Sequence, residues 1–350
     1  MALTTKADER KRAGTGTVRL LFTCIGRRVE LLRAFQRAAK ALRVRLESHG
    51  ADATRLSPGF HLVDRAHLVP RIDSGGYIDA LANLVKRQRV HLLIPLLDPE
   101  LPLIAEAAPR LAEFGCRAVI SSPRVVRTCR DKLETYKALR AAGINTPQTW
   151  DWMHALALKQ HRFPYFLKPR FGSAGKGNYV VSNAEELRTL GQRVPDPIVQ
   201  EFVEGVEHTL DVYTGLDGRP QCVVPRRRLE VRTGEVSKAL IVKDKELMAL
   251  GCRVAEALGE CRGVVTVQCI RTADGRIQAI EINPRLGGGA PLAIHAGADF
   301  PKWLLAEHLG RRVRINPTGF RGDVAMLRFD DSVFVPNATR KCGVDARSGP

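Results

Sequence analysis

The segment FPYFLKPRFGSAGKGNYVVS at residues 163–182 decides the fold class. FPYFLKP (163–169) and NYVVS (178–182) are rich in β-forming residues, so the segment predicts a β-hairpin with a glycine-rich tip. The tip consists of Gly172, Ser173, Ala174, Gly175, Lys176 and Gly177. Its backbone N–H groups can turn toward phosphate oxygens while Lys176 adds positive charge, although an ordinary glycine-rich hairpin is the alternative. A Walker A loop is excluded, because Gly177 follows Lys176 where Ser or Thr is required.

A second hairpin is predicted at Asp274-Gly275. If these two residues form the turn, Gln268 lies opposite Glu281, and the period of two places Asn283 on the same face as Glu281. The side-chain oxygens of Gln268, Glu281 and Asn283 then converge, and hard oxygen ligands around one carboxylate suit Mg²⁺. The alternative is a solvated polar face. Apolar residues alternate with the three, which indicates a half-buried sheet and favours the metal.

The N-terminal third alternates strands and helices. VRLLFTC (18–24) reads as a strand, VELLRAFQRAAKAL (29–42) repeats apolar residues at helical spacing, and HLLIPLL (91–97) and CRAVISS (116–122) read as further strands. This alternation predicts a parallel sheet covered by helices, with a ligand crevice at the strand C-termini that contains Cys24 to Arg28 and Asp98 to Glu100. Arg27 and Arg28 are candidate ligands for a substrate carboxylate. The G-x-G-x-x-G spacing of nicotinamide-binding proteins is absent.

Composition limits the remaining classes. The 350 residues predict two or three domains, and 44% hydrophobic residues are enough for a sizeable core. The formal charge of +18 would suit a nucleic-acid partner, but no tract of five or six like charges occurs and aromatic residues make up only 6%. We therefore expect small anionic ligands, no nucleic acid and no membrane. With a polar N-terminus and scattered cysteines, the sequence predicts a cytoplasmic protein with reduced thiols.

Five motifs in order resemble the ATP-grasp superfamily, particularly one half of the carbamoyl phosphate synthetase large chain. They are Asp131-Lys132, FLKPRFGSAGKG (166–177), QEFVEGVEHTLDV (200–212), RRRLEVRTGEVSK (226–238) and IEINPRLGGG (280–289). The resemblance implies an α/β fold, in which an N-terminal parallel α/β pre-ATP-grasp domain precedes an ATP-grasp fold of two α+β subdomains with a mobile lid. The expected divisions are a disordered tail (1–17), the pre-ATP-grasp domain (18–122), the N-terminal ATP-grasp part (123–203, lid about 160–200), the C-terminal subdomain (204–310) and an extension (311–350).

The same resemblance implies a role for each matching residue. Lys132 and Lys168 would contact ATP phosphates, and the segment 172–177 would close over them. Gln200, Glu201, Phe202 and Val203 would bind adenine through their backbone, and Glu207 would hold the ribose hydroxyls. Gln268, Glu281 and Asn283 match the metal-binding triad for Mg²⁺, or Mn²⁺ in its place. Arg285 and Arg228, with Lys168, would act on the transferred phosphoryl group. Gln268 replaces the acidic residue common elsewhere in the superfamily, which leaves the number of metal ions open.

The function implied is that of an ATP- and Mg²⁺-dependent ligase. A carboxylate would be activated as an acylphosphate with release of ADP, and an amine or similar nucleophile would then displace phosphate. Two alternatives stay open: a carboxyphosphate or carbamate kinase like those of carbamoyl phosphate synthetase, and a nucleotide-binding regulatory protein without turnover. The expected partners are a small carboxylate and an amine, and a homodimer is an open possibility.

Overall fold

The computed structural model describes residues 16–172, 175–232 and 234–343, and these form two compact units. The first contains residues 16–120, 299–314 and 329–343, and the second contains residues 121–298 and 315–328 with the gaps named above. Most of the tail expected at 1–17 lies outside the described residues, although Thr17 already belongs to the first strand. The expected boundaries near 203 and 310 remain predictions.

A five-stranded parallel sheet forms the centre of the first unit, as the sequence predicts. Its strands are β1 (Thr17–Thr23), β2 (Arg45–Asp52), β3 (Arg65–Leu68), β4 (Leu92–Pro95) and β5 (Arg117–Ala118), in the order β3-β2-β1-β4-β5. The order reverses direction after β3, so the crossover helix before the reversal and the two that follow it lie on opposite faces of the sheet. Strands β2 and β3 were not expected, because their sequences RLESHGAD and RAHL lack the apolar run typical of a buried strand.

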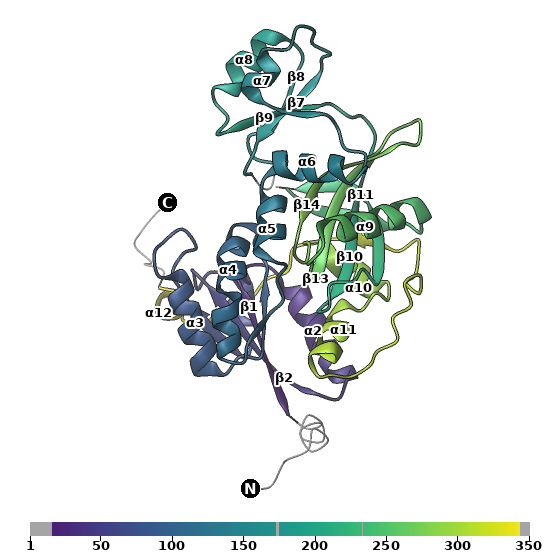
Figure 1. Cartoon of the computed structure of the whole chain (residues 1–350). Helices are drawn as coiled ribbons and strands as arrows, with labels where there is room; N and C mark the ends of the chain where they lie inside the picture. Colours follow the sequence, from purple (N-terminus) through teal and green to yellow (C-terminus); the bar gives the residue numbers. More distant parts are fainter. Residues whose placement is uncertain (1–15, 173–174, 233, 344–350) are drawn as a thin grey trace. The chain divides into compact units, whose positions relative to one another are not determined.

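Helices cover this sheet (Figure 1). They are α2 (Val29–Ala41), α3 (Tyr77–Gln88), α4 (Leu101–Glu113) and α11 (Phe300–His308), with short helical turns η1 (Pro58–His61), η2 (Asp98–Glu100) and α12 (Ala338–Cys342). The buried side of α2 includes Leu31, Leu32 and Phe35, and the Phe35 ring packs edge-on against Phe22 of β1 with ring centroids 5.3 Å apart. Helical periodicity in the sequence therefore identified the face of α2 that meets the sheet.

The second unit is built on a six-stranded antiparallel sheet. Its strands are β10 (Val206–Gly215), β11 (Cys222–Arg232), β12 (Glu235–Ile241), β13 (Gly263–Arg271), β14 (Ile277–Asn283) and β15 (Ala325–Leu327), in the order β14-β13-β10-β11-β12-β15. Helix α9 (Lys245–Leu258) packs on one face, where Leu247 and Val254 join Val265, Val267 and Ile282 in an apolar cluster. The other face carries polar residues. Helices α5 (Pro123–Arg130), α6 (Lys132–Ala141) and α10 (Ala290–His295) complete this part.

A four-stranded sheet in the same unit contains the predicted glycine-rich hairpin. Its strands are β6 (Thr149–Asp151), β7 (Tyr165–Pro169), β8 (Tyr179–Val181) and β9 (Pro197–Glu201), in the order β6-β9-β7-β8. Helices α7 (Trp152–Leu156) and α8 (Ala184–Gly191) lie beside it (Figure 1). Leu167, Val181, Leu187 and Val199 form its separate core. Antiparallel pairing of Leu167 with Tyr179 confirms that 163–182 is a hairpin.

Candidate functional site

Strands β13 and β14 place the three predicted metal ligands on one sheet face. Gln268 pairs with Glu281, and Thr266 pairs with Asn283, which confirms the predicted register. The Nδ2 of Asn283 donates a hydrogen bond to Oε1 of Glu281 at 3.3 Å, so the two side chains meet. That contact leaves Oδ1 of Asn283 available to a cation. The site therefore offers carboxylate and amide oxygens, which are donors suited to Mg²⁺.

The geometry that produces this register differs from the prediction. Thr272 N donates to Arg276 O at 2.9 Å, so the tip has three residues, 273–275, rather than two. Gly275 takes a left-handed φ of 88°, as a glycine does at the end of a three-residue hairpin loop. A bulge between the Cys269–Ala279 and Gln268–Glu281 pairs then adds one residue, Ile280, to β14 and restores the expected pairing. Without that bulge, Glu281 would face the apolar cluster.

Lys168 is a buried cation on β7. Its side chain is 5% exposed, and Nζ donates to Oε1 of Gln200 at 2.9 Å. The Nε2 of Gln200 donates in turn to Oγ1 of Thr149 at 2.8 Å, and this contact fixes the orientation of the Gln200 side-chain amide, with Oε1 toward Lys168. Burial lowers the pKa of Lys168 to about 8, the negative charge of Glu281 opposes that shift, and the positive charge of Lys132 adds to it. The pKa of Lys168 therefore depends on the charge of Glu281, a proposed metal ligand, and on that of Lys132, a second proposed phosphate ligand.

Lys132 begins α6 and faces the start of the glycine-rich segment. Its Nζ donates to the carbonyl oxygen of Gly172 at 2.9 Å. Asp131 caps the helix by accepting from the backbone N–H groups of Leu133 and Glu134. Arg170 grips the same carboxylate through two hydrogen bonds of 2.8 and 2.6 Å, and although burial opposes the shift, these contacts lower the pKa of Asp131. The cap and the arginine thus hold Lys132 beside β7.

The rest of the predicted nucleotide-binding segment is described in part. Gly175 and Gly177 have left-handed φ angles of 70° and 74°, which glycine adopts without steric cost, and Lys176 is exposed. Ser173 and Ala174 lie outside the described residues. Gln200 and Glu201 end β9, where the Glu201 carboxylate accepts from Gln148 N at 3.1 Å. Phe202 is 41% exposed and Val203 half-buried in the irregular connection that follows.

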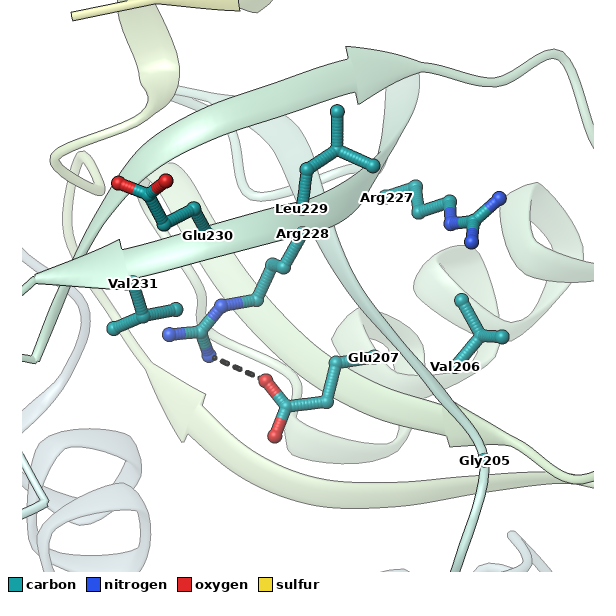
Figure 2. Close-up of a pocket in the computed structure, with 8 residues that line it drawn as sticks. All are labelled: Gly205, Val206, Glu207, Arg227, Arg228, Leu229, Glu230 and Val231. Carbon is teal, nitrogen blue, oxygen red and sulfur yellow. Dashed lines mark ion pairs between the residues drawn. The ribbon is translucent and has the colours of Figure 1, made fainter.

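Glu207 and Arg228 form an ion pair across β10 and β11 (Figure 2). Nη1 of Arg228 lies 3.1 Å from Oε2 of Glu207, and the two side chains are 12% and 47% exposed. They line a hollow of about 330 Å³, along with Gly205, Val206, Arg227, Leu229, Glu230 and Val231. Glu207, which is expected to hold the ribose, is therefore the ion-pair partner of Arg228, which is expected to act on the phosphoryl group. An anion or a hydroxyl group in this hollow would compete with the pair.

Sequence reasoning missed a buried ion pair on the same polar face. Arg226 of β11 donates from Nε to Oδ2 of Asp211 at 2.6 Å and from Nη2 to Oδ1 at 3.0 Å, and both side chains are at most 1% exposed. Strand pairing places Thr209 of β10 between Gln268 of β13 and Arg226 of β11. The ion pair on β10 and β11 therefore lies next to the strands that carry the triad. The alternation of Arg226 with Arg228 and the aspartate of the motif QEFVEGVEHTLDV are the signals that could have found it.

The segment after Asn283 folds back onto this face. The carbonyl oxygen of Arg285 accepts from Oγ1 of Thr266 at 2.9 Å, and Nη1 of Arg285 donates to Leu286 O at 3.1 Å. A Cβ atom at Gly289 would overlap Nη1 of Arg226 and lie 2.8 Å from its Cζ. The glycines of IEINPRLGGG therefore allow the chain to approach the buried pair closely.

The crevice predicted in the first unit also brings its residues together. Sγ of Cys24 lies 3.9 Å from the hydroxyl of Tyr77, which donates to Oε2 of Glu100 at 2.7 Å. Gly26 N donates to Oδ2 of Asp52 at 2.9 Å. Burial raises the pKa of Glu100, whose carboxylate also accepts from the backbone N–H groups of Leu96 and Leu97. Cys24 and Glu100 thus lie close together at the carboxyl edge of the sheet, as expected.

In the part of the chain that the structure describes, no group of three His, Cys, Asp or Glu residues is placed to hold a metal ion. A metal site made of Gln268, Glu281 and Asn283 therefore depends on amide oxygens. Within the same ranges, every helix is too short or too polar to span a bilayer. All eight cysteines are free thiols.

Comparison with known proteins identifies two domains in the chain. Residues 129–289 match the model of an ATP-grasp domain, and residues 20–120 match that of a PylC-like N-terminal domain. A carbamoyl phosphate synthase large chain from Archaeoglobus fulgidus is 24% identical over 275 residues, 71% of this chain and 25% of that protein. The 3-methyl-D-ornithine–L-lysine ligase of Methanosarcina acetivorans is 29% identical over 185 residues, 52% of this chain and 46% of that protein. The chain therefore spans less than half of the length of either relative.

Solved structures show the same fold. The L-amino acid ligase of Bacillus licheniformis superposes with a TM-score of 0.66 at 20% identity, covering 83% of this chain and 74% of that one. The biotin carboxylase domain of the Hydrogenobacter thermophilus 2-oxoglutarate carboxylase gives a TM-score of 0.70 at 17% identity, covering 87% and 73%. The chain therefore contains an ATP-grasp domain preceded by a PylC-like N-terminal domain, and it resembles one half of the carbamoyl phosphate synthase large chain.

Proposed function

We propose that this protein is an ATP-dependent, ADP-forming ligase that joins a small carboxylate to an amine. The observation that carries the proposal is the electrostatic link between Lys168 and Glu281, because a buried cation and a carboxylate on two different sheets suit opposite sides of a bound Mg²⁺–triphosphate. A purely structural lysine would be expected in an ion pair, whereas Nζ of Lys168 donates to the neutral amide of Gln200 and forms no ion pair with any of the described residues.

ATP would bind between the two sheets of the second unit. Lys132 and Lys168 would contact its phosphates together with the backbone of 172–177. The segment Gln200 to Val203 would offer backbone groups to adenine, and Glu207 would accept hydrogen bonds from the ribose hydroxyls. The lowered pKa of Lys168 supports this assignment, because phosphate charges would restore the protonated state that burial disfavours.

Gln268, Glu281 and Asn283 would hold Mg²⁺, or Mn²⁺ in its place. Their fit is supported by the shared sheet face and by the 3.3 Å contact between Asn283 and Glu281, which brings two ligands together before any ion arrives. When bound, the ion neutralises phosphate charge and orients the triphosphate. The single carboxylate makes Glu281 the ligand whose charge matters most.

The reaction would proceed in two displacements. A carboxylate oxygen attacks the γ-phosphorus while the bond to the bridging oxygen breaks, giving an acylphosphate and ADP. The amine then attacks the carbonyl carbon, phosphate leaves, and the nitrogen loses a proton. Arg285 and Arg228, with Lys168, would stabilise the negative charge on the transferring group. Ribose hydroxyls bound to Glu207 would compete with its 3.1 Å ion pair to Arg228, which would free the guanidinium for the phosphoryl group.

Three further expectations belong to the same proposal. Relatives named as ligases support small-molecule substrates, with an amino acid as the first carboxylate to test. The biotin carboxylase domain of the Hydrogenobacter thermophilus 2-oxoglutarate carboxylase is a dimer, which supports testing for a homodimer. Eight free thiols support a reducing compartment such as the cytoplasm.

Hydroxylamine trapping tests the proposal. The protein is incubated with Mg²⁺–ATP, hydroxylamine and each member of an amino-acid and carboxylate panel, and hydroxamate and nucleotide products are measured. We expect ADP and the hydroxamate of one acid to form together without any amine substrate, and Lys168→Ala to lose both. AMP and pyrophosphate would instead mean adenylation. ADP formation with bicarbonate alone would favour the carboxyphosphate kinase, and no turnover with any acid would favour the regulatory protein.

A further inference from the structure

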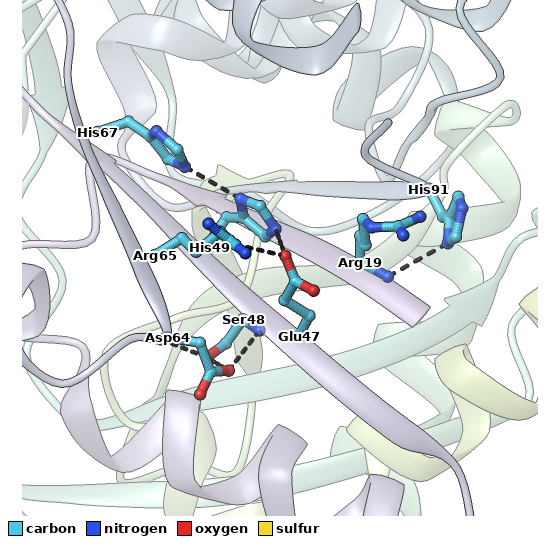
Figure 3. Close-up of polar contacts among 8 residues, drawn as sticks. All are labelled: Arg19, Glu47, Ser48, His49, Asp64, Arg65, His67 and His91. Atoms are coloured by element: carbon cyan, nitrogen blue, oxygen red, sulfur yellow. Dashed lines mark hydrogen bonds and ion pairs between the residues drawn. The ribbon is translucent and has the colours of Figure 1, made fainter. Parts of the chain in front are cut away.

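A group of polar residues on β2 and β3 of the first unit has no role in the proposed reaction (Figure 3). His49 lies between His67 and Glu47, with its Nδ1 3.0 Å from Nε2 of His67 and its Nε2 3.1 Å from Oε1 of Glu47. Arg65 Nε donates to the same Oε1 at 2.8 Å. His49 is fully buried, and the two imidazole rings are stacked with centroids 5.2 Å apart. The four side chains form one continuous series of hydrogen bonds.

The series of hydrogen bonds from His67 through His49 to Glu47 determines which ring nitrogens of the two histidines carry protons. A carboxylate only accepts, so Nε2 of His49 must carry the hydrogen that reaches Glu47. A neutral His49 then has a bare Nδ1, which accepts from Nε2–H of His67. A neutral His67 is therefore left with an unprotonated Nδ1, a hydrogen-bond acceptor.

The charge states agree with this assignment. Burial lowers the pKa of His49, although Glu47 opposes the shift. Burial, followed by the charges of His49, Arg87 and Arg65, lowers the pKa of His67 to about 4. Burial acts to raise the pKa of Glu47, but the hydrogen bond from Arg65 outweighs it, so the pKa of Glu47 is lowered. Both histidines are thus neutral and Glu47 is ionised at neutral pH.

His67 also lines a pocket between the edge strand β3 and helix α3. The pocket measures about 490 Å³, and its lining residues are Ala66, His67, Leu68, Val69, Ala80, Asn83, Leu84 and Arg87. Arg87 and Asn83 are exposed, and in the described ranges Arg87 forms no ion pair. The pocket is therefore lined by one cation, one amide and one histidine, and its other lining residues are apolar.

We propose that this pocket is a second binding site, for a small anion that carries an O–H or N–H donor close to its negative charge. Arg87 binds the charged group, and Nδ1 of His67 accepts from the donor. Asn83 can serve either part, because its amide both donates and accepts. An anion without a donor would face the lone pair of His67 and be disfavoured. The site lies outside the second unit and does not depend on the proposed ligase reaction.

Inorganic phosphate and sulfate test the proposal, because only phosphate carries a donor at neutral pH. The ¹⁵N resonances of the His67 ring, assigned with His67→Gln, are followed while each anion is added to the full-length protein. We expect a saturable shift with phosphate and at least a tenfold weaker response with sulfate. Phosphate bound at the ATP site does not interfere, because the signal comes from His67 itself.

Variants separate recognition from general charge. Arg87→Gln should weaken phosphate binding at least tenfold, whereas Arg89→Gln, a nearby exposed arginine that does not line the pocket, should leave it unchanged. Glu47→Leu removes the acceptor that fixes the histidine protons, so phosphate and sulfate should then bind alike. Glu47→Gln keeps an acceptor oxygen and should preserve the preference. Equal binding of the two anions by the unmodified protein, or no saturable shift with either, would overturn the proposal.

Discussion

If Lys168 contacts the ATP phosphates as proposed, its lowered pKa makes ATP binding depend on pH. With a pKa of about 8, the protonated fraction in the free protein falls from about nine tenths at pH 7 to about one tenth at pH 9. Bound phosphates favour the protonated lysine, so the complex resists this loss. The dissociation constant of a non-hydrolysable Mg²⁺–ATP analogue should therefore rise about tenfold between pH 7 and pH 9, or about 1.4 kcal/mol.

Titration calorimetry at several pH values measures this profile, and two variants test its cause. Lys168→Arg keeps its charge throughout the range, so its profile should be flat. Glu281→Gln removes the charge that raises the pKa of Lys168, so without Mg²⁺ its loss of affinity should begin at lower pH. A flat profile for the unmodified protein, or the same tenfold loss in Lys168→Arg, would refute this role of Lys168.

The remaining predictions concern the metal triad and the buried pair. Glu281→Gln should abolish Mg²⁺-dependent ATP turnover with an unchanged melting temperature; activity retained at saturating Mg²⁺ would contradict the metal assignment. Asp211→Ala leaves the charge of Arg226 buried without its partner, so we expect a loss of about 3–5 kcal/mol and a melting temperature lower by roughly 10 °C. Combining it with Arg226→Met should recover most of that loss. Gly289→Ala should cost about 1–3 kcal/mol by overlap with Arg226, while Gly75→Ala, which has open space around it, serves as the control.

The elements that the sequence predicted correctly are those whose pattern is local. Helix α2 and strand β1 repeat apolar residues at their own periods, so their buried faces could be identified without knowing their neighbours. Strands β2 and β3 were missed because their buried side includes His49, which is fully buried yet polar. Its burial is tolerated only because Glu47 and His67 satisfy both ring nitrogens, and that compensation comes partly from another strand.

The candidate metal site shows a different limit. The sequence paired Gln268 with Glu281 correctly, but by assuming a two-residue turn and a regular strand. In the structure a three-residue tip and the bulge at Ile280 shift the register by one residue in opposite directions. No local pattern marks this bulge, since it exists only relative to β13.

By itself, the sequence determined which residue types were available and in what order: the glycine-rich hairpin, the oxygen donors of β14 and the lysines at 132 and 168. Only the tertiary structure decided which of them meet. Arg226 and Arg228 are two residues apart on one strand, yet one is buried against Asp211 and the other pairs with a half-exposed Glu207. The same holds for Lys168, whose lowered pKa arises from burial and from charges on other elements. Burial and electrostatic coupling are properties of the space around a side chain, and that space is made by segments distant in sequence.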